Sequence, residues 1–511
     1  MSASTERKNR QAARAAGTDK KMLAAQEEAK KKAVSKRRWT LGTIAVILLI
    51  ALILFLDSGF LYTRTTALTI GDAKYSPAEV NYRYGNQYYT LLGQYGSYAS
   101  MLGLDSSAGV AGLDAQDCPM LDGGTWKDYF LQAATDEMVQ TKALTDYAAE
   151  NGISLTEEEI AAVSDSLGDM DAVAKERGYA NANNFFAANY GNGVTAAIVR
   201  EAGLQSSLAS KAYSSYRDSL NYSDEDLESY YQSLDGASDR FDFLLYTVTA
   251  PVEEGAEAPS EQALAEARAT AEAIYMAYAD GSDIEDVQER FEVAVDSQLE
   301  GEQPSLRSGV YGSSLSEDYG EWLKAAEREP GDATSVSNAA GGSVVVFLSR
   351  DDNHYKTANV RHILVMAQAS EDGSYSDEAK AAAKARAEEI LAEYEAGEKT
   401  EESFAALAEQ YSEDGGSNTN GGLYENIAKG QMVPEFDAFC FADHRAGDTA
   451  IVYGESSGYA GYHVMYYVGE GELYSSTIAR SDLLNLDMQE WIEGLTANYE
   501  AVPGSAYRRI G

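Results

Sequence analysis

The chain has 511 residues, of which 82 are Asp or Glu and 40 are Lys or Arg, so its formal net charge is −42 at pH 7. Because single hydrophobic cores rarely grow beyond about 250–300 residues, this length excludes a one-domain protein. Such an acidic chain repels the phosphate backbone of nucleic acids, which argues against nucleic-acid binding by most of the molecule.

The N-terminal part has the opposite charge. Residues 1–38 contain 12 Lys or Arg and 4 Asp or Glu, which leaves 28 and 78 for the rest of the chain. An uncharged apolar run, Trp39 to Leu56, follows directly. At about 1.5 Å per residue a helix over 39–58 approaches the thickness of a bilayer core. We therefore expect a basic cytoplasmic tail at 1–38 and a transmembrane anchor at 39–58.

Two alternatives compete with this interpretation of the N-terminus. A cleaved signal peptide fits less well, because no small-residue cleavage site follows the apolar run. A nucleic-acid-binding arm is possible for any basic segment, but a position next to an apolar run favours membrane topology. The expected location is thus the cell membrane, with a single span, a cytoplasmic N-terminus and most of the chain outside the cytoplasm.

Cysteines and histidines are scarce. Cys118 and Cys440 are far apart in sequence, so we expect two separate thiols, although one bridge is arithmetically possible. The four histidines show no spacing typical of a zinc site. No metal and no cofactor are expected.

Residues 64–235 have mainly helical patterns. Helix starts are expected at Ser76, at Thr156 and at Ser223, each of which precedes an acidic residue in its first turn. The tyrosine-rich stretch at 83–101 either lines a groove for unfolded polypeptide or belongs to an ordinary helix core. We expect one helical domain over 64–235.

The rest of the chain contains a repeat of roughly 110 residues. A strand pattern, an Ala-rich helix and a second strand pattern occur at 238–350, and the same order returns at 357–470. This pattern favours a duplicated domain. Residues 471–511 begin with an amphipathic helix that needs a partner to pack on. The expected fold class is α+β and multidomain.

The second repeat contains five motifs in order, which are VRHILV, FAALAEQYSEDGGS, GGLYENIAKGQMVPEFDAFCF, AGD and GYHVMYYV. In this order they resemble the parvulin-type peptidyl-prolyl cis-trans isomerases. The helical domain and the tandem repeats further resemble the SurA and PrsA class of extracytoplasmic foldases. The resemblance implies two parvulin-like domains, each a small antiparallel sheet with helices, a SurA-like helical module at 64–235, and a C-terminal helix at 471–511 that packs on it.

The resemblance also implies a catalytic site. His362 and His463 match the paired histidines beneath the parvulin active site, and Asp414 matches the residue that faces the prolyl carbonyl. The residues that it places around the proline ring are Leu423, Met432 and Phe436. A single histidine in an apolar strand is more often a core residue than a catalyst, but the ordered set of motifs favours the site. We expect the two histidines to be hydrogen-bonded to each other.

The implied function is isomerisation of X-Pro bonds in unfolded, exported proteins, without a covalent step or a cofactor. Rotation about such a bond meets a barrier of about 18–20 kcal/mol. The loop after the first strand, AQASEDGSYSDE, is acidic, so phosphopeptides are not the expected substrates. The alternatives are a catalytically silent holdase chaperone and a structural scaffold.

The first repeat lacks the site. Alignment by sequence puts Phe243 opposite His362 and Val344 opposite His463. We therefore expect residues 238–350 to keep the fold without catalysis, either as a client-binding module or as an inert copy.

Overall fold

The computed structural model describes residues 3–17, 20–57, 59–456 and 458–511, without the side chains of 20–22, 26, 52–57 and 97. It divides into two compact units, which are described separately. One unit contains residues 1–220 and 487–511, and the other contains residues 221–486.

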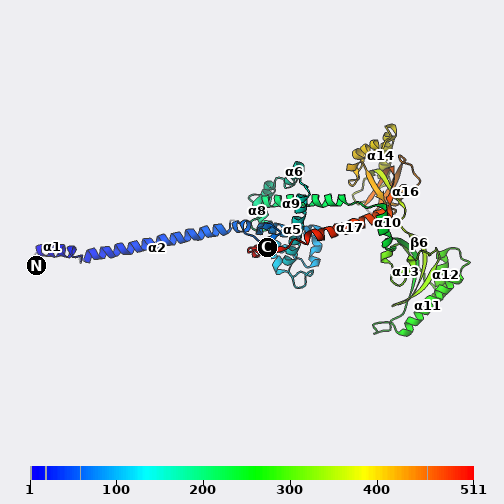
Figure 1. Ribbon diagram of the computed structural model, residues 1–511, viewed down its shortest axis with the longest axis horizontal. Helices are drawn as coiled ribbons and strands as arrows, with labels where there is room; N and C mark the ends of the chain where they lie inside the picture. The colour runs from blue at the N-terminus through cyan, green and yellow to red at the C-terminus, as the bar shows by residue number, and fades with distance from the viewer. Residues whose placement is uncertain (1–2, 18–19, 58, 457) are drawn as a thin grey trace. The chain divides into compact units, whose positions relative to one another are not determined.

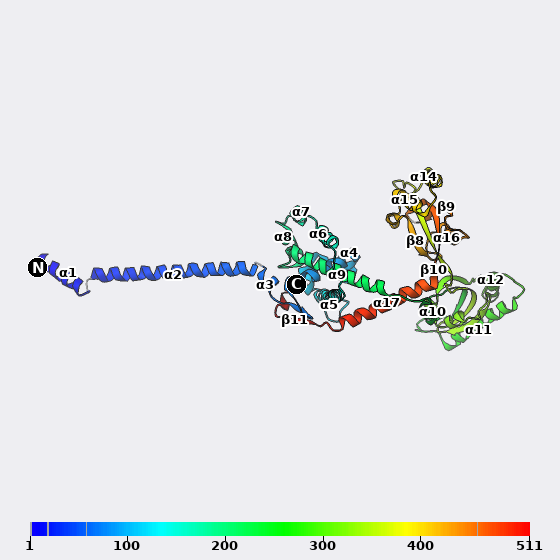
Figure 2. The same cartoon turned by 45° about the horizontal axis from the view of Figure 1, so that its top comes forward.

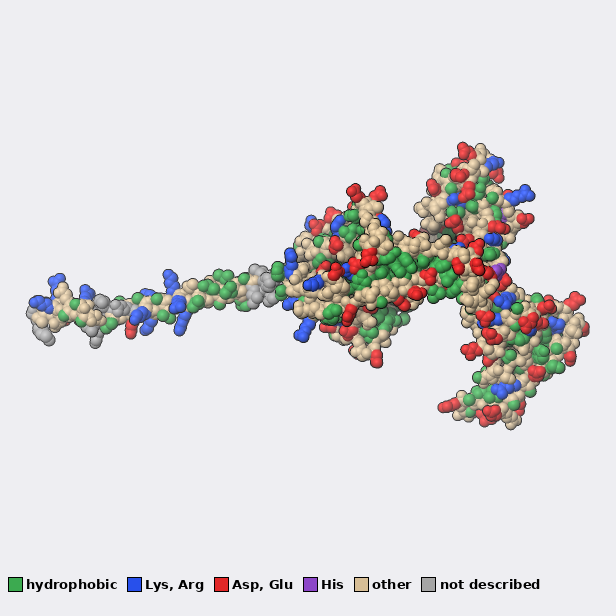
Figure 3. Space-filling view, viewed as in Figure 1, with side chains coloured by type: hydrophobic (Ala, Val, Ile, Leu, Met, Phe, Trp, Pro, Cys, Tyr) green, Lys and Arg blue, Asp and Glu red, His purple; other side chains and the backbone are tan. Residues whose placement is uncertain are grey.

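The chain begins with two helices, α1 (Ala3–Ala15) and α2 (Lys20–Asp57). Figure 3 shows Lys and Arg side chains along α1 and the first part of α2, ahead of a hydrophobic stretch. Among the described residues, no helix is long and apolar enough to cross a membrane. The prediction of a transmembrane anchor at 39–58 is therefore wrong for the described residues, and the side chains of 52–58 lie outside them.

The first unit is mainly helical (Figure 1). Its further helices are α3 (Phe60–Arg64), α4 (Pro77–Tyr95), α5 (Trp126–Glu150), α6 (Glu157–Ser166), α7 (Met170–Glu176), α8 (Ala182–Tyr190) and α9 (Ala196–Ser219), with the short 3-10 helices η1 (Gly96–Leu102), η2 (Ser106–Ala108), η3 (Val110–Ala115) and η6 (Tyr507–Arg509). The helix starts predicted at Ser76 and Thr156 are confirmed, because both residues form capping boxes. In each box, the acidic side chain three residues later accepts the backbone N–H of the cap.

Two segments that lie far apart in the sequence form a small sheet in this unit. β1 (Leu68–Ile70) lies between β2 (Ala73–Tyr75) and β11 (Ala501–Pro503), and both pairings are antiparallel. Ile510 then enters a core that contains Tyr84 and Trp126. Near the end of α17 (Tyr474–Thr496), the ring of Trp491 stacks on Tyr216 with centroids 3.9 Å apart. The C-terminal residues are thus part of the helical unit.

The second unit contains two four-stranded antiparallel sheets. It opens with α10 (Asp224–Ser233), where the helix start predicted at Ser223 is confirmed and Ser223 forms a capping box with Asp226. The elements of the first repeat are β3 (Arg240–Thr249), α11 (Glu261–Asp280), α12 (Val287–Gln298), β4 (Ser305–Tyr311), η4 (Gly312–Ser314), α13 (Gly320–Lys324), β5 (Ala333–Asn338) and β6 (Gly341–Asp351). Those of the second repeat are β7 (Lys356–Met366), α14 (Asp377–Ala396), α15 (Glu401–Tyr411), η5 (Asn418–Asn420), β8 (Leu423–Ile427), α16 (Pro434–Cys440), β9 (Thr449–Ser456) and β10 (Tyr459–Leu473).

The two sheets have the same topology, β4-β3-β6-β5 and β8-β7-β10-β9. In the second repeat, α14 and α15 cover one face of the sheet (Figure 2). Ile363 and Val464 lie in the core between these helices and the sheet. The other face packs against α16, with Val360 and Met465 in a second core. Successive side chains of a strand point to opposite faces, so His362 lies on the α16 face with Val360.

The strand register corrects one alignment of the repeats. His362 pairs with Met465, and His463 pairs with Leu364. If Phe243 corresponds to His362, then Phe347, which pairs with Phe243, corresponds to Met465. Val345 precedes Phe347 by two residues, as His463 precedes Met465, so Val345 corresponds to His463. The alignment by sequence places Val344 opposite His463, but Val344 faces the other side of the sheet, in the core beneath α11 and α12. A shift of one residue reverses the face of a strand, and only the pairing reveals it.

The two cysteines are both buried free thiols, as predicted. Burial raises the pKa of the Cys440 thiol to about 12, so it stays protonated as a small core side chain.

Shortening Ile510 to Ala should destabilise the first unit, because this side chain is only 2% exposed in its core. The expected loss in free energy of unfolding is about 2–4 kcal/mol. Hydrogen exchange of the α5 amides measures it separately from the second unit. Val502→Ala is the matched control, since Val502 is 49% exposed and should change stability by less than about 0.5 kcal/mol. Equal effects of the two substitutions would contradict this packing.

Candidate active site in the second repeat

Two histidines meet on the α16 face of the second sheet. His362 in β7 and His463 in β10 are diagonal neighbours across the antiparallel pair, a spacing that long side chains can bridge. Their Nδ1 atoms are 3.0 Å apart, and their rings are stacked with centroids 5.1 Å apart. Both residues are buried. The predicted hydrogen bond between them is therefore present.

The loop after α15 is tied to β7. The Ser412 hydroxyl oxygen accepts the backbone N–H of Leu364 at 3.1 Å and that of Asp414 at 3.3 Å. On the other side of the loop, the carbonyl of Gly422 accepts the N–H of His362 at 2.9 Å. Gly422 has a φ of +73°, and a Cβ there would lie 2.2 Å from the carbonyl oxygen of His362. Only glycine allows this close approach, which holds the loop against the strand.

Asp414 is the acceptor at one end of the site. Its Oδ2 lies 2.8 Å from His362 Nε2 and also accepts the hydroxyls of Ser417 at 2.5 Å and Tyr424 at 3.0 Å. Its Oδ1 accepts the N–H of Gly416 at 3.0 Å. The hydrogen bond from His362 is the main reason why the pKa of Asp414 lies well below its usual value. Asp414 is therefore a carboxylate, and its side chain is 19% exposed while that of His362 is 4% exposed.

Tyr459 occupies the other end. Its hydroxyl is hydrogen-bonded to Nε2 of His463. Gly454 makes room for this contact, because a Cβ there would lie 2.8 Å from the Tyr459 hydroxyl and 3.0 Å from His463 Nε2. Burial raises the pKa of Tyr459 to about 12 and lowers the pKa of His463 to about 3. At neutral pH the phenol thus keeps its proton and His463 is uncharged.

These contacts fix the direction of the hydrogen bonds when both imidazoles are neutral. Because the Asp414 carboxylate can only accept, His362 must donate from Nε2, and its Nδ1 is then an acceptor. His463 must therefore donate from Nδ1, and its Nε2 accepts the Tyr459 hydroxyl. One chain of donors runs from Tyr459 through both histidines to Asp414, and every ring nitrogen is satisfied.

The three predicted apolar residues are placed differently. Phe436 is buried, and its ring lies edge-on to both imidazoles, with centroids 5.4 Å from His362 and 5.2 Å from His463. Met432 packs against the same core as Phe436. Leu423 begins β8, where it pairs with Arg361 and is half-buried. The aromatic ring is thus in direct contact with the histidines.

Sequence reasoning missed three members of the site, which are Ser417, Tyr424 and Tyr459. Ser417 and Tyr424 lie in or beside the quoted motifs, so their proximity to Asp414 was a usable signal. Tyr459 precedes His463 by four residues, and residues i and i+4 of a strand point to the same face. The residue between them on that face is Gly461, which pairs with Gly454 and leaves the space open.

The described residues contain no group of three or more His, Cys, Asp or Glu side chains that is arranged to hold a metal ion. What the site offers chemically is a buried, directed hydrogen-bond chain that ends at a partly exposed carboxylate beside an aromatic ring.

Comparison with known proteins locates a family in this part of the chain. Residues 346–466 match the PPIC-type PPIase domain, which is the parvulin type. Chaperone SurA of Pseudomonas fluorescens (strain Pf0-1) is 30% identical over 200 residues, which cover 34% of this chain and 42% of that protein. Chaperone SurA of Hahella chejuensis is 36% identical over 105 residues, or 20% of this chain and 22% of that protein. The chain thus spans less than half the length of these curated relatives.

Solved structures of PrsA proteins are also similar in part. The peptidylprolyl isomerase PrsA of Bacillus cereus is 28% identical in a match that covers 28% of this chain and 49% of that protein, with a TM-score of 0.18. PrsA of Bacillus subtilis is 14% identical in a match that covers 73% of this chain and 88% of that protein, with a TM-score of 0.28.

His463 should stay neutral over the whole range in which an ordinary histidine titrates. Its pKa is lowered from 6.5 to about 3, chiefly by burial, so ring chemical shifts recorded by NMR should not change between pH 8 and pH 5. Tyr459→Phe removes the donor to the neutral ring and should raise this pKa. A midpoint near pH 6.5 in the unaltered chain would contradict the hydrogen-bond direction.

The same shift makes the stability of the second repeat depend on pH. Between pH 6.5 and pH 3 the unfolded His463 binds a proton that the folded residue does not, so acidification favours unfolding. We expect the free energy of unfolding to fall as the pH drops below about 6.5, by at most roughly 1.4 kcal/mol per pH unit from this group. Asp414, whose pKa is also lowered, adds a loss in the same direction at lower pH. Denaturant unfolding at pH 7 and pH 5 measures the change, and His463→Phe should make it smaller.

Proposed function

We propose that this chain, which contains a parvulin-type peptidyl-prolyl isomerase domain at 346–466 and shares sequence with SurA chaperones, is an extracytoplasmic foldase. It catalyses cis-trans isomerisation of X-Pro bonds in unfolded polypeptides. The observation that carries the proposal is the hydrogen-bond chain through His463 and His362 to Asp414, set against the ring of Phe436.

The reaction requires stabilisation of a twisted amide. Resonance holds the X-Pro bond planar behind a barrier of about 18–20 kcal/mol, and each tenfold acceleration takes about 1.4 kcal/mol off it. In the twisted state the carbonyl oxygen loses part of the negative charge that resonance places on it. A carboxylate beside that oxygen therefore disfavours the planar form more than the twisted form.

The site residues have distinct roles in this proposal. Asp414 acts on the prolyl carbonyl, and His362 holds the carboxylate ionised and oriented through its Nε2–H. His463 fixes the tautomer of His362. The proline ring is received by the apolar residues, which are Leu423, Met432 and Phe436. No bond other than hydrogen bonds is made or broken.

The charges near the site favour an unphosphorylated substrate. Lys380, in the first turn of α14 after the acidic loop, is already paired with Glu455 at 2.9 Å. The loop itself contains Glu371 and Asp372 and is tied to the β9–β10 hairpin by the Tyr375 hydroxyl, which donates to the carbonyl of Gly458 at 2.9 Å. A phosphate needs cationic partners, and this surface repels it. The substrate is thus proline in unfolded chain rather than in a phosphopeptide.

The first repeat has apolar residues at the positions of the two histidines. Phe243 and Val345 stand where the second repeat has its histidines, and both belong to an apolar core with Phe241 and Leu323. Such a face offers no polar group to a carbonyl, so we propose that isomerisation occurs in the second repeat alone.

A protease-coupled assay on a short proline peptide tests the proposal with the full chain. Asp414→Asn keeps the size of the side chain but removes its charge, and we expect kcat/KM to fall by roughly 10- to 100-fold. His354→Asn is the control, because His354 lies outside the second sheet, and should leave the rate unchanged. Full activity of a triple His362, His463 and Asp414 variant would refute the assignment. An inactive unaltered chain that still binds unfolded protein would support the holdase alternative instead.

A further inference from the structure

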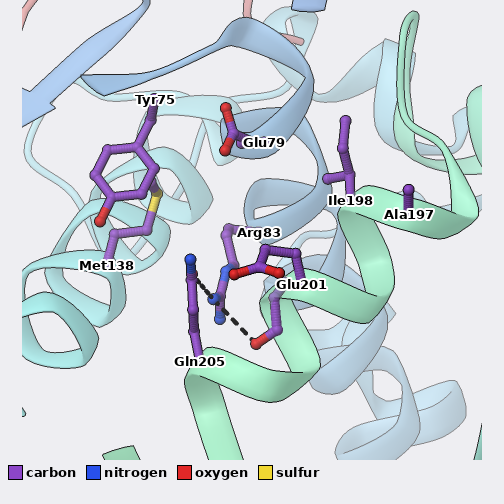
Figure 4. Close-up of a pocket in the computed structure, with 9 residues that line it drawn as sticks. Tyr75, Glu79, Arg83, Met138, Ala197, Ile198, Glu201 and Gln205 are labelled. Carbon is purple, nitrogen blue, oxygen red and sulfur yellow. Dashed lines mark hydrogen bonds between the residues drawn. The ribbon is translucent and has the colours of Figure 1, made fainter. Parts of the chain in front are cut away.

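A cavity in the helical unit is explained by the packing of its helices. It has a volume of about 200 Å³ and is lined from β2, α4, α5 and α9. Figure 4 shows Arg83 of α4 directed toward Gln205 of α9, whose amide oxygen accepts from it at 3.3 Å. Arg83 is also ion-paired with Glu137 of α5 and donates to the Ser206 hydroxyl at 3.0 Å. These contacts hold α4 against α5 and α9, so the cation of the cavity is used within the unit.

The second repeat contains a side chain whose contacts extend the candidate site, Tyr424 of β8. Tyr424 pairs with Val360 of β7, which precedes His362 by two residues. Directly opposite residues of an antiparallel pair share a face of the sheet, as do residues two apart in one strand. Tyr424 therefore lies on the α16 face with His362, and their ring centroids are 5.4 Å apart. Its side chain is half-buried against the core that contains Phe436.

The hydroxyl of Tyr424 contacts one particular oxygen of Asp414. It donates to Oδ2 at 3.0 Å, and the same oxygen accepts the Nε2–H of His362 at 2.8 Å and the hydroxyl of Ser417 at 2.5 Å. A carboxylate oxygen has two lone pairs, so three donors saturate Oδ2. Oδ1 accepts one hydrogen bond from the described residues, the N–H of Gly416 at 3.0 Å. The negative charge of the carboxylate is thus least compensated at Oδ1.

The three donors to Oδ2 come from different parts of the fold. Ser417 follows Asp414 by three residues and belongs to the same loop. His362 and Tyr424 belong to β7 and β8, so their hydrogen bonds tie the carboxylate to the sheet from two neighbouring strands. The torsion of a carboxyl group about its χ2 bond is broad, so donors from fixed elements are needed to hold one orientation.

Tyr424 can only donate in this contact, because the ionised Asp414 can only accept. Burial, and then the negative charge of Asp414, raises the pKa of Tyr424, so the phenol keeps its proton at neutral pH. Gly416 leaves the space for the contact, since a Cβ there would lie 3.3 Å from the Tyr424 hydroxyl and 3.3 Å from Asp414 Oδ1. The loop therefore approaches the phenol closely at a residue without a side chain.

We propose that Tyr424 is a positioning residue for the isomerisation. Its hydroxyl holds Asp414 by Oδ2, and Oδ1 is then the oxygen that lies beside the prolyl carbonyl of the substrate. A carboxylate in one orientation acts on the planar amide in every encounter, whereas one that turns brings its compensated oxygen to the carbonyl for part of the time. The inference rests on the proposed foldase function, to which it adds the residue that orients the acting group and the atom that acts.

Tyr424→Phe in the full chain removes the hydroxyl and keeps the ring. Two-dimensional exchange NMR of a short proline peptide at several concentrations gives kcat and KM. We expect kcat to fall roughly 3- to 10-fold with KM changed by less than about twofold, because the peptide still binds but Asp414 is less well oriented. A second readout is the Nε2–H resonance of His362. It should move downfield, because Oδ2 with one donor fewer accepts more strongly from those that remain.

Tyr453→Phe is the matched control. Tyr453 is also a half-buried tyrosine of the second sheet whose hydroxyl donates to a carboxylate, that of Glu455, but it lies on the face covered by α14 and α15. Its substitution should leave kcat, KM and the His362 resonance unchanged. Full kcat in Tyr424→Phe, an equal loss in Tyr453→Phe, or a rise in KM at constant kcat would overturn the inference.

Asp414→Asn separates the inference from the proposed function. A slow Asp414→Asn variant together with a fully active Tyr424→Phe variant would refute the role of Tyr424 while the isomerase assignment stands. An unaltered chain that produces no exchange between the cis and trans peptide would refute the proposed function, and the inference with it. Slow turnover in both variants, with the His362 resonance moved only in Tyr424→Phe and not in Tyr453→Phe, is the result that the inference requires.

Discussion

The candidate site depends on the burial of two imidazoles that must be satisfied without solvent. His362 and His463 share one hydrogen bond between their Nδ1 atoms, so only one of them can donate there. The carboxylate of Asp414 at one end and the hydroxyl of Tyr459 at the other determine which histidine donates. A buried polar group without a partner costs about 1–3 kcal/mol, so the hydrogen bonds of Tyr459 and Asp414 stabilise the two buried imidazoles between them. The same arrangement leaves the carboxylate of Asp414 at the edge of the site, where its side chain is 19% exposed.

The duplicated fold separates the scaffold from the chemistry. Both repeats have the same strand order, with helices over one face of the sheet. In the first repeat the other face is filled by Phe243 and Val345, which pack with apolar neighbours and need no partners. The histidine pair is therefore not required to form the sheet. In the second repeat it is present together with the glycines at 422 and 454, which make room for the loop and for Tyr459.

Much of this could be predicted from the sequence, for identifiable physical reasons. Capping boxes at Ser76, Thr156 and Ser223 are local, so the residues themselves specify them. The histidine pair followed from motif order. The partner of His463 could not be predicted in the same way, because it depends on two facing glycines in different strands. The alignment of Val344 with His463 was wrong because the register of a strand is set by its pairing with neighbouring strands. The transmembrane prediction was wrong for the described residues, among which no helix is long and apolar enough to cross a membrane.

The central claim is that the second repeat accelerates rotation about X-Pro bonds and does not merely hold unfolded chain. Two-dimensional exchange NMR of a proline peptide, recorded with a small fraction of the full chain, separates these possibilities in one experiment. The account predicts exchange peaks between the cis and trans resonances on a time scale of well under the tens of seconds of the uncatalysed reaction. Shift changes that report binding, with no exchange peaks at any concentration of the chain, would contradict it.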